Sequence, residues 1–157
     1  MAQDLLERIL KKDPGFFEAL VIKLLVAMGY GGSLNEAAGM VVGKSGDEGI
    51  DGIIKEDKLG LDNIYIQAKR WNNVVERPEV QKFVGALAGK GATKGIFITT
   101  SSFSRGAREF KPQNNIKIVL IDGNQLCEYM IDYNIGVFTA NTFEVKRIDI
   151  DFFESEE

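Results

Sequence analysis

The chain has 157 residues, of which 45% are hydrophobic and 27% are charged, and its formal net charge is −4. This length predicts a single domain over residues 1–157 that buries about two-thirds of its unfolded surface. No window approaches the roughly 20 apolar residues of a membrane span, and the first residues mix acids with bases and lack the apolar block of a secretion signal. We therefore expect a cytoplasmic protein that does not contact a membrane.

The residue types that are missing exclude several kinds of chemistry. The chain contains no histidine and a single cysteine, Cys127. An internal disulfide, a cysteine-clustered zinc site, an imidazole zinc site and any nucleophile activated by histidine are all excluded. Chemistry must rely on carboxylates, amides, lysine, hydroxyl groups or a hard metal ion bound by oxygen.

The charges are unevenly distributed along the chain. Residues 1–66 carry 7 basic and 11 acidic side chains, residues 67–117 carry 10 and 3, and residues 118–157 carry 2 and 9. The basic middle third could bind a polyanion, because the local field rather than the net charge steers a partner. A solvated, lysine-rich surface explains the same counts equally well.

The first half predicts two helices followed by three strands. Residues 7–12 form a short amphipathic helix, and a second helix begins after the cap residue Asp13 and stops before Gly29. This second helix is apolar nearly all round, which is typical of a helix packed on both sides. Short strands are then expected at residues 35–42 and 49–57, and another at residues 62–70.

The second half predicts strands that alternate with helices. Helices are expected at residues 76–91, at 102–110 with a cap at Ser102 or a neighbour, and at 122–134 with a cap at Asp122. Buried strands are expected at 94–100 and 116–122, and a last extended segment at 142–153 leads into an acidic tail at 150–157. This alternation requires parallel pairing, so the class is α/β with a mixed central sheet flanked by helices.

Three polar residues form the main candidate site. Gln67 and Lys69 leave the same face of one strand, because side chains two apart in a strand are parallel. Asp51 begins the preceding strand and can face Gln67 if the two strands form a hairpin. A carboxylate and an amide oxygen suit Mg²⁺, with Lys69 beside a phosphate. Alternatively, Asp51 only satisfies a turn, and Gln67 and Lys69 are the solvent side of an edge strand.

Glu18 adds a fourth candidate. It lies on an otherwise hydrophobic helix, where a carboxylate is costly unless it is paired or bound to a cation. It could pair with Lys69 or another base, or it could be a further ligand of the same metal. Either role would place it near the strand ends.

The sequence resembles a known family over residues 5–133. The segments that carry the resemblance, in order and spacing, are "FFEALVIKLLVAMGYGG", "GDEGIDGIIKEDKLGLDNIYIQAKRW", "RPEVQKFVGALAG" and "KGIFITTSSFSRGAREF". They are similar to the catalytic domain of Mrr-type (type IV) restriction endonucleases, of the PD-(D/E)XK nuclease superfamily. The resemblance implies an α-β-β-β-α-β restriction-endonuclease-like core and a metal-dependent phosphodiesterase.

The resemblance also implies roles for single residues. Asp51 is the metal-binding aspartate, Gln67 stands in the place of an acidic ligand, and Lys69 is the catalytic lysine, with the backbone carbonyl of Ala68 completing the metal site. Glu18 matches a glutamate of the first helix and would restore the negative charge that Gln67 lacks. Glu48 stands where this branch often has glycine, and it is either an outer ligand or simply exposed.

The expected function is a Mg²⁺-dependent DNA endonuclease, with Mn²⁺ as a substitute, that restricts methylated or otherwise modified double-stranded DNA. Its products would carry 5′-phosphate and 3′-hydroxyl ends. A homo-oligomer would supply the two sites for double-strand cleavage, and residues 1–12 are interpreted as the stub of a linker to a winged-helix domain. The basic residues expected to grip DNA are Arg70, Arg77, Lys82, Lys90, Arg105 and Arg108.

Two other functions stay open. Because Gln67 replaces an acid, the chain could be a catalytically inactive DNA-binding or interaction module on a nuclease scaffold. A nuclease that acts on RNA or branched DNA is the second alternative.

Overall fold

The computed structural model describes residues 1–32, 39–41 and 49–154, and for residues 39–41 it describes the backbone only. The described elements, in chain order, are α1 (Ala2–Leu10), α2 (Pro14–Ala27), β1 (Gly39–Val41), β2 (Gly52–Lys55), β3 (Asn63–Lys69), α3 (Arg77–Gly89), β4 (Lys94–Thr99), α4 (Arg105–Glu109), β5 (Lys117–Ile121), α5 (Gly123–Asp132) and α6 (Ile150–Glu154). The strand predicted at residues 35–42 falls partly on β1 and otherwise outside the described residues.

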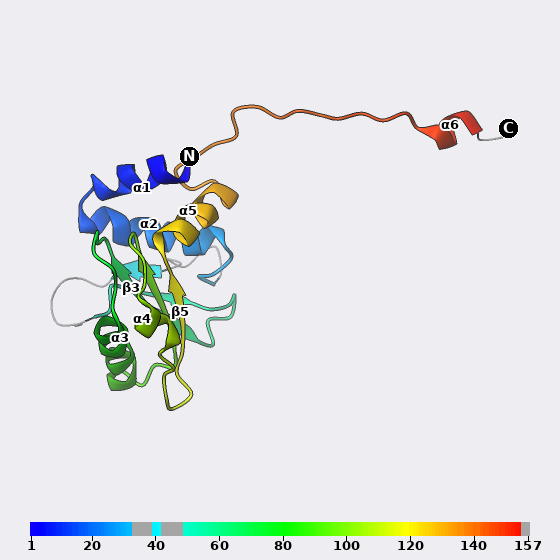
Figure 1. Cartoon of the computed structure of the whole chain (residues 1–157). Coiled ribbons are helices and arrows are strands. Elements are labelled where there is room, and N and C mark those ends of the chain that lie inside the picture. The colour runs from blue at the N-terminus through cyan, green and yellow to red at the C-terminus, as the bar shows by residue number, and fades with distance from the viewer. Residues whose placement is uncertain (33–38, 42–48, 155–157) are drawn as a thin grey trace.

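The described strands form one mixed sheet in the order β1–β2–β3–β4–β5. β2 pairs antiparallel with β1 and β3, whereas β4 pairs parallel with β3 and β5. Figure 1 shows α1, α2 and α5 on one face of this sheet and α3 and α4 on the other. The predicted α/β class and mixed sheet are confirmed.

Alternation along the strands divides the core into two layers. Ile64, Ile66 and Ala68 of β3 pack with the buried faces of α1, α2 and α5. Residues of the other parity, such as Tyr65 of β3 and Phe97 of β4, pack with α3 and α4. Side chains of odd number on β3 therefore face α3, and this parity places Gln67 and Lys69 on that same face.

The two N-terminal helices meet at a sharply capped turn. The Asp13 Oδ1 atom accepts a hydrogen bond of 2.7 Å from the backbone N–H of Phe16, as the sequence predicted for the start of α2. Gly29 has a φ of 105° just beyond the end of α2, which only glycine adopts without strain. The first helix begins earlier than predicted, at Ala2, because Leu5 and Ile9 bury one side of it against the core.

α2 is less enclosed than its composition predicted. Its buried side chains form one stripe, which includes Phe17, Val21 and Leu24. Phe16 and Val26 remain 45% and 40% exposed. The helix is therefore covered on the sheet side and partly open on the other.

Helix caps in the second half agree with the prediction, but the last segment does not. Ser104, a neighbour of Ser102, caps α4, and Asp122 with Gln125 forms a capping box at α5.

Residues 142–153 were predicted to be extended, and the final part is instead the short helix α6. The Asp149 Oδ1 atom accepts a hydrogen bond from the backbone N–H of Phe152, which starts a helical turn locally.

Among the described residues, no helix has both the length and the apolar character needed to cross a membrane.

Candidate active site

Asp51 and Gln67 come together where β2 begins and β3 ends. The antiparallel register pairs Gly52 with Ile66, and the backbone N–H of Asp51 donates to the carbonyl oxygen of Ile66 at 2.8 Å. This register carries Asp51 to a position opposite Gln67. The contact therefore depends on a hairpin, as the sequence pattern required.

The Asp51 carboxylate is bound by two donors from β3. Its Oδ2 atom accepts from the Gln67 Nε2 atom at 2.7 Å and from the backbone N–H of Ala68 at 2.7 Å. Among the described residues, no donor is found for Oδ1 of the same carboxylate. The Oδ2 atom thus orients the carboxylate toward β3.

The Gln67 amide is buried, with 4% of the residue exposed, and its orientation is specific. Nε2 faces Asp51, while Oε1 lies so near Gly49 that a Cβ atom added there would be 3.3 Å away. An amide oxygen, not an amide nitrogen, binds a metal ion. Coordination by Gln67 beside Asp51 therefore requires the amide to rotate by half a turn from this hydrogen-bonded state.

The Ala68 carbonyl lies on the side of β3 that faces Asp51. The carbonyl of Ile66 accepts from Asp51, and that of Lys69 accepts from Thr99 and Thr100 of the β4 side. Because carbonyls alternate along a strand, the Ala68 carbonyl points toward the β2 side, next to its own N–H. This edge accordingly gathers the Asp51 carboxylate and the Ala68 carbonyl, and the Gln67 amide would add its oxygen only after rotation. Oxygen donors of these kinds suit a hard divalent cation.

Lys69 ends β3 beside an aromatic ring. Its Nζ atom lies 5.1 Å from the centroid of the Trp71 ring, within the range of a cation–π contact. The hydroxyl of Thr99 donates to the Lys69 carbonyl at 2.8 Å and fixes the strand end. Sequence reasoning missed Trp71, although its place two residues after Lys69 was a usable signal.

Glu18 is not brought to the same face as Gln67 and Lys69. It lies half-buried in the second turn of α2, and α2 packs on the layer formed by Ile66 and Ala68. Its role as a ligand or ion-pair partner stays a prediction. Glu48 lies outside the described residues.

The described residues include no cluster of three or more acidic, cysteine or histidine side chains that could hold a metal. Asp51 supplies one carboxylate, and the other oxygen donors described here are neutral. A bound cation would therefore meet less negative charge than a pair of acids provides.

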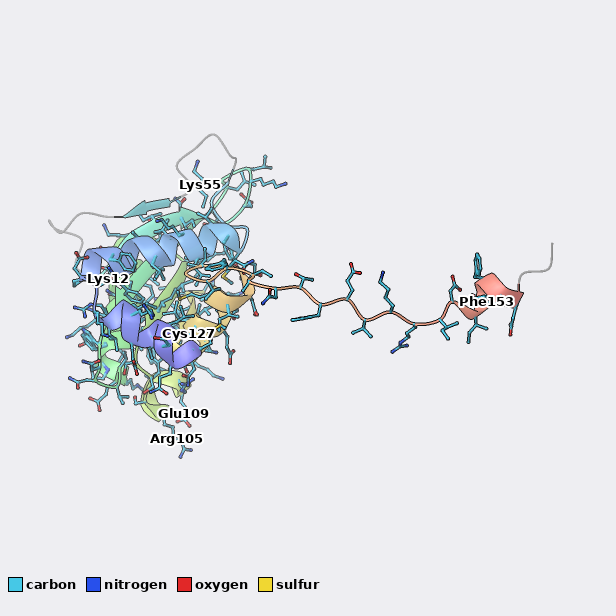
Figure 2. All side chains as sticks on the ribbon, turned by 90° about the horizontal axis from the view of Figure 1, so that it is seen from above. Lys12, Lys55, Arg105, Glu109, Cys127 and Phe153 are labelled. Carbon is cyan, nitrogen blue, oxygen red and sulfur yellow. The ribbon has the colours of Figure 1, made fainter. Side chains whose placement is uncertain are left out.

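The six basic residues predicted to bind DNA have varied surroundings. Four of them already contact groups of the protein. The Arg77 guanidinium lies 5.3 Å from the centroid of the Phe110 ring. The other three form ion pairs, namely Lys82 with Glu79 at 3.3 Å, Arg105 with Glu109 at 2.8 Å and Arg108 with Asp122 at 3.0 Å. Lys90 is exposed at the end of α3. Exposed pairs such as Arg105–Glu109, labelled in Figure 2, open at little cost, so these residues remain candidates.

Arg70 differs from the others because it is tied to the helical layer. Its Nη1 atom donates to the carbonyl oxygen of Leu10 at 2.9 Å, and its buried Nε atom has no hydrogen-bond partner in the part of the chain that the structure describes. The guanidinium therefore joins the end of β3 to the turn between α1 and α2. This contact gives Arg70 a structural role in addition to the predicted DNA contact.

The fold is the PD-(D/E)XK-like fold of restriction endonucleases, as two solved structures show. The DNA modification-dependent restriction endonuclease AspBHI superposes with a TM-score of 0.66 over 87% of this chain and 36% of its own, at 20% identity. The MspJI restriction endonuclease, solved in complex with a 27-mer oligonucleotide, superposes with a TM-score of 0.61 over 86% of this chain and 32% of its own, at 25% identity.

The family is shown by sequence. The family model described as "Mrr_cat: Restriction endonuclease" matches residues 9–130, and the chain belongs to this family. The type IV methyl-directed restriction enzyme EcoKMrr of Escherichia coli (strain K12) is 46% identical over 154 residues, which is 98% of this chain. The chain spans about half (49%) of the length of that relative. The predicted resemblance is confirmed.

Proposed function

We propose that this chain is the catalytic domain of a Mg²⁺-dependent DNA endonuclease that restricts modified, in particular methylated, double-stranded DNA. Membership of a restriction endonuclease family supports DNA hydrolysis, and members of this family generally use divalent metal ions. The names of EcoKMrr and AspBHI, which refer to methyl-directed and modification-dependent enzymes, support the choice of substrate. The sole observation that carries the site assignment is the convergence of Asp51, Gln67 and Ala68.

The oxygen donors at this edge fit a divalent cation. Oδ1 of Asp51, the Ala68 carbonyl and, after rotation, Oε1 of Gln67 would hold it, and Glu18 would add charge. When bound, such an ion supplies Lewis-acid activation of the phosphodiester and of water.

Lys69 supplies the remaining chemistry in this proposal. Its ammonium donates hydrogen bonds to the attacking water and to a phosphate oxygen, where negative charge grows in the transition state. Trp71 holds the amine near the end of β3 before the substrate arrives. Attack of water on phosphorus with loss of the 3′-oxygen leaves 5′-phosphate and 3′-hydroxyl ends.

Plasmid cleavage tests the proposal. The chain is incubated with methylated and unmethylated supercoiled plasmid in Mg²⁺, in Mn²⁺ and in EDTA. We expect metal-dependent nicking of the methylated plasmid, and we expect Asp51→Ala and Lys69→Ala each to lower its rate about 100-fold or more. Lys23→Ala, which changes an exposed lysine of α2, is the matched control and should cut normally.

The alternative is a DNA-binding module that does not cut. It is favoured by the Gln67 amide, which replaces an acid and hydrogen-bonds to Asp51. Retarded migration of the plasmid without any nicking, unchanged in Asp51→Ala and Lys69→Ala, would establish this alternative and exclude the nuclease. RNA and branched DNA, tested in the same reaction, decide between the remaining substrates.

A further inference from the structure

The segment that follows β3, residues 70–74, lies beside the segment that follows β4. The parallel ladder between the two strands pairs Lys69 with Thr99, and an isolated bridge pairs Val75 with Phe103. Between these pairs the chain advances six positions after β3, from 69 to 75, but only four after β4, from 99 to 103. The longer segment cannot keep a regular ladder, so its backbone groups need other partners.

Side-chain hydroxyl groups supply these partners. The Thr99 Oγ1 atom donates to the carbonyl oxygen of Lys69 at 2.8 Å, and the Thr100 Oγ1 atom donates to the carbonyl oxygen of Trp71 at 2.8 Å. The backbone N–H of Thr100 also donates to the Lys69 carbonyl oxygen, at 3.2 Å. Two consecutive threonines therefore hold the backbone of the lysine and of its aromatic neighbour.

Both threonines are buried and their hydroxyl groups are oriented. Thr99 is 0% exposed and Thr100 is 4% exposed, so water does not replace these hydrogen bonds easily. The Thr99 hydroxyl also accepts from the backbone N–H of Ser101 at 3.1 Å, so its single proton is directed to the Lys69 carbonyl. Because threonine is restricted at χ1, the backbone that carries each hydroxyl sets its direction.

The contact that depends on this arrangement is the one between Lys69 and Trp71. The Lys69 Nζ atom lies 5.1 Å from the centroid of the indole ring, and the ring packs against the core layer that contains Phe97. β3 ends at Lys69, so the direction of the indole is set by backbone outside the regular strand. Thr100 fixes that backbone at Trp71, and Thr99 fixes it at Lys69.

We propose that Thr99 and Thr100 are positioning residues of the candidate active site, which set the place of the Lys69 ammonium. The proposal rests on the nuclease function proposed above, in which Lys69 donates hydrogen bonds to the attacking water and to a phosphate oxygen. Each threonine acts through a backbone carbonyl and does not touch the substrate. A displacement of a reacting group by about 1 Å can lower a rate about 100-fold, so small shifts of the backbone matter here.

Tryptophan fluorescence tests the positioning without DNA or metal. Trp71 is the only tryptophan of the chain, so its emission intensity and anisotropy report on this ring alone. Lys69→Met removes the ammonium and defines the intensity change of a lost contact. We expect Thr99→Val and Thr100→Val to change the intensity in the same direction and to lower the anisotropy. The serine variants of both positions keep the hydroxyl group and should retain the wild-type emission.

Ile54→Val is the matched control for a loss of stability. Ile54 is 1% exposed and pairs with Ile64, at the opposite end of β3 from Lys69. Removal of a buried methyl group lowers the Tm, as removal of a buried hydrogen bond does. The emission of Trp71 should nevertheless stay unchanged in this control, because a general loss of stability leaves the folded site as it was.

Single-turnover cleavage of the plasmid relates the positioning to the reaction. We expect Thr100→Val to lower the rate constant about tenfold, and Thr99→Val about threefold, because the N–H of Thr100 still binds the Lys69 carbonyl. The serine variants and Ile54→Val should cut within about twofold of the wild-type rate. The affinity for DNA, measured in EDTA, should also stay within about twofold in every variant, because neither threonine contacts the substrate.

Several outcomes would overturn the proposal. They are a wild-type emission in Lys69→Met or in the valine variants, an equal loss in serine and valine variants, and valine variants that cut at the wild-type rate. A wild-type protein that cuts no plasmid would refute the nuclease function and, with it, the catalytic part of the proposal. Changed emission in the valine variants would in that case still establish that the two threonines position Lys69 and Trp71.

Discussion

Gln67 is the residue where the candidate site departs from a pair of carboxylates. Its Nε2 atom donates to Asp51 in a buried position, so the amide compensates the Asp51 charge when no cation is bound. The same amide weakens the site for a cation by one negative charge. If the proposed metal site is correct, Gln67 in place of an acid lowers the affinity for the cation and raises the stability of the protein without it.

The substitution Gln67→Glu tests this balance. Two facing carboxylates replace a charge-assisted hydrogen bond, which costs about 1–3 kcal/mol in EDTA and lowers Tm by about 2–10 °C. Added Mn²⁺ should restore more Tm in the variant than in the wild-type protein, because it neutralises both acids. Differential scanning fluorimetry with and without Mn²⁺ measures both shifts. Gln81→Glu, on the exposed side of α3, should show neither, and an equal effect in both variants would contradict the interpretation.

The sequence predicted the residues of this contact but not its details. Asp51 and Gln67 were identified because a hairpin suffices to bring them together, and Lys69 because strand alternation places it on the same face as Gln67. The direction of the Gln67 amide and the Trp71 contact depend on packing against Gly49 and α3, which no period in the sequence encodes. Sequence pattern does not specify which face of the sheet a helix covers, so the role of Glu18 on α2 stays a prediction.

At the scale of elements, α3 and β4 are joined by a close contact at Gly95. A Cβ atom added there would lie 2.7 Å from the Phe83 ring and 2.8 Å from Leu87, whereas one added at Gly85 of the same helix would meet nothing within 4 Å. The close packing of α3 on β4 therefore requires glycine at residue 95 of β4. At residue 85 of α3, which is exposed, there is room for a larger side chain.

Two alanine substitutions give opposite results on this basis. Gly85→Ala should stabilise the protein by about 0.5–1 kcal/mol, because alanine loses less backbone entropy in a helix. Gly95→Ala should destabilise it by about 1–3 kcal/mol, because the core would be overpacked. Urea unfolding measures both, and a stabilising effect of Gly95→Ala would show that α3 lies farther from β4 than the structure has it.

A second link between elements is electrostatic. Lys94, at the start of β4, pairs with Glu56 and with Asp62, the latter at 2.9 Å, and so joins β4 to the turn between β2 and β3. Hydrogen bonding to Glu56 and then to Asp62 raises the pKa of Lys94, and the same lysine lowers the pKa of Asp62 below 3.8. Both shifts favour the charged forms in the folded state.

The contribution of this cluster should depend on pH at both extremes. The lowered pKa of Asp62 means that its stabilisation is present above pH 3.8 and is lost as the pH falls through the lowered value. The raised pKa of Lys94 means that its stabilisation is present below pH 10.5 and is lost as the pH rises through the raised value. The difference in urea midpoint between wild-type and Lys94→Met should therefore be constant near neutral pH and shrink in strong acid. Lys58→Met is the exposed control, and a difference that grows in acid would contradict the assignment.

At the scale of the whole molecule, periodicity predicted the order of strands and helices and the mixed sheet. Strand alternation and the caps at Asp13 and Asp122 carried most of this information. The C-terminal segment was predicted to be extended throughout because its apolar residues resemble a strand pattern. The segment joins no strand of the sheet that the structure describes, and the Asp149 cap turns its end into α6.

The β2–β3 hairpin has a consequence for how the protein is made. Asp51 and Gln67 are separated by only 16 positions, and closing so short a loop costs little chain entropy. Hairpins of this kind form within about 1–10 μs, far faster than a ribosome adds a residue. The nascent polypeptide can therefore bring its acid and amide together before β4 and β5 join the sheet.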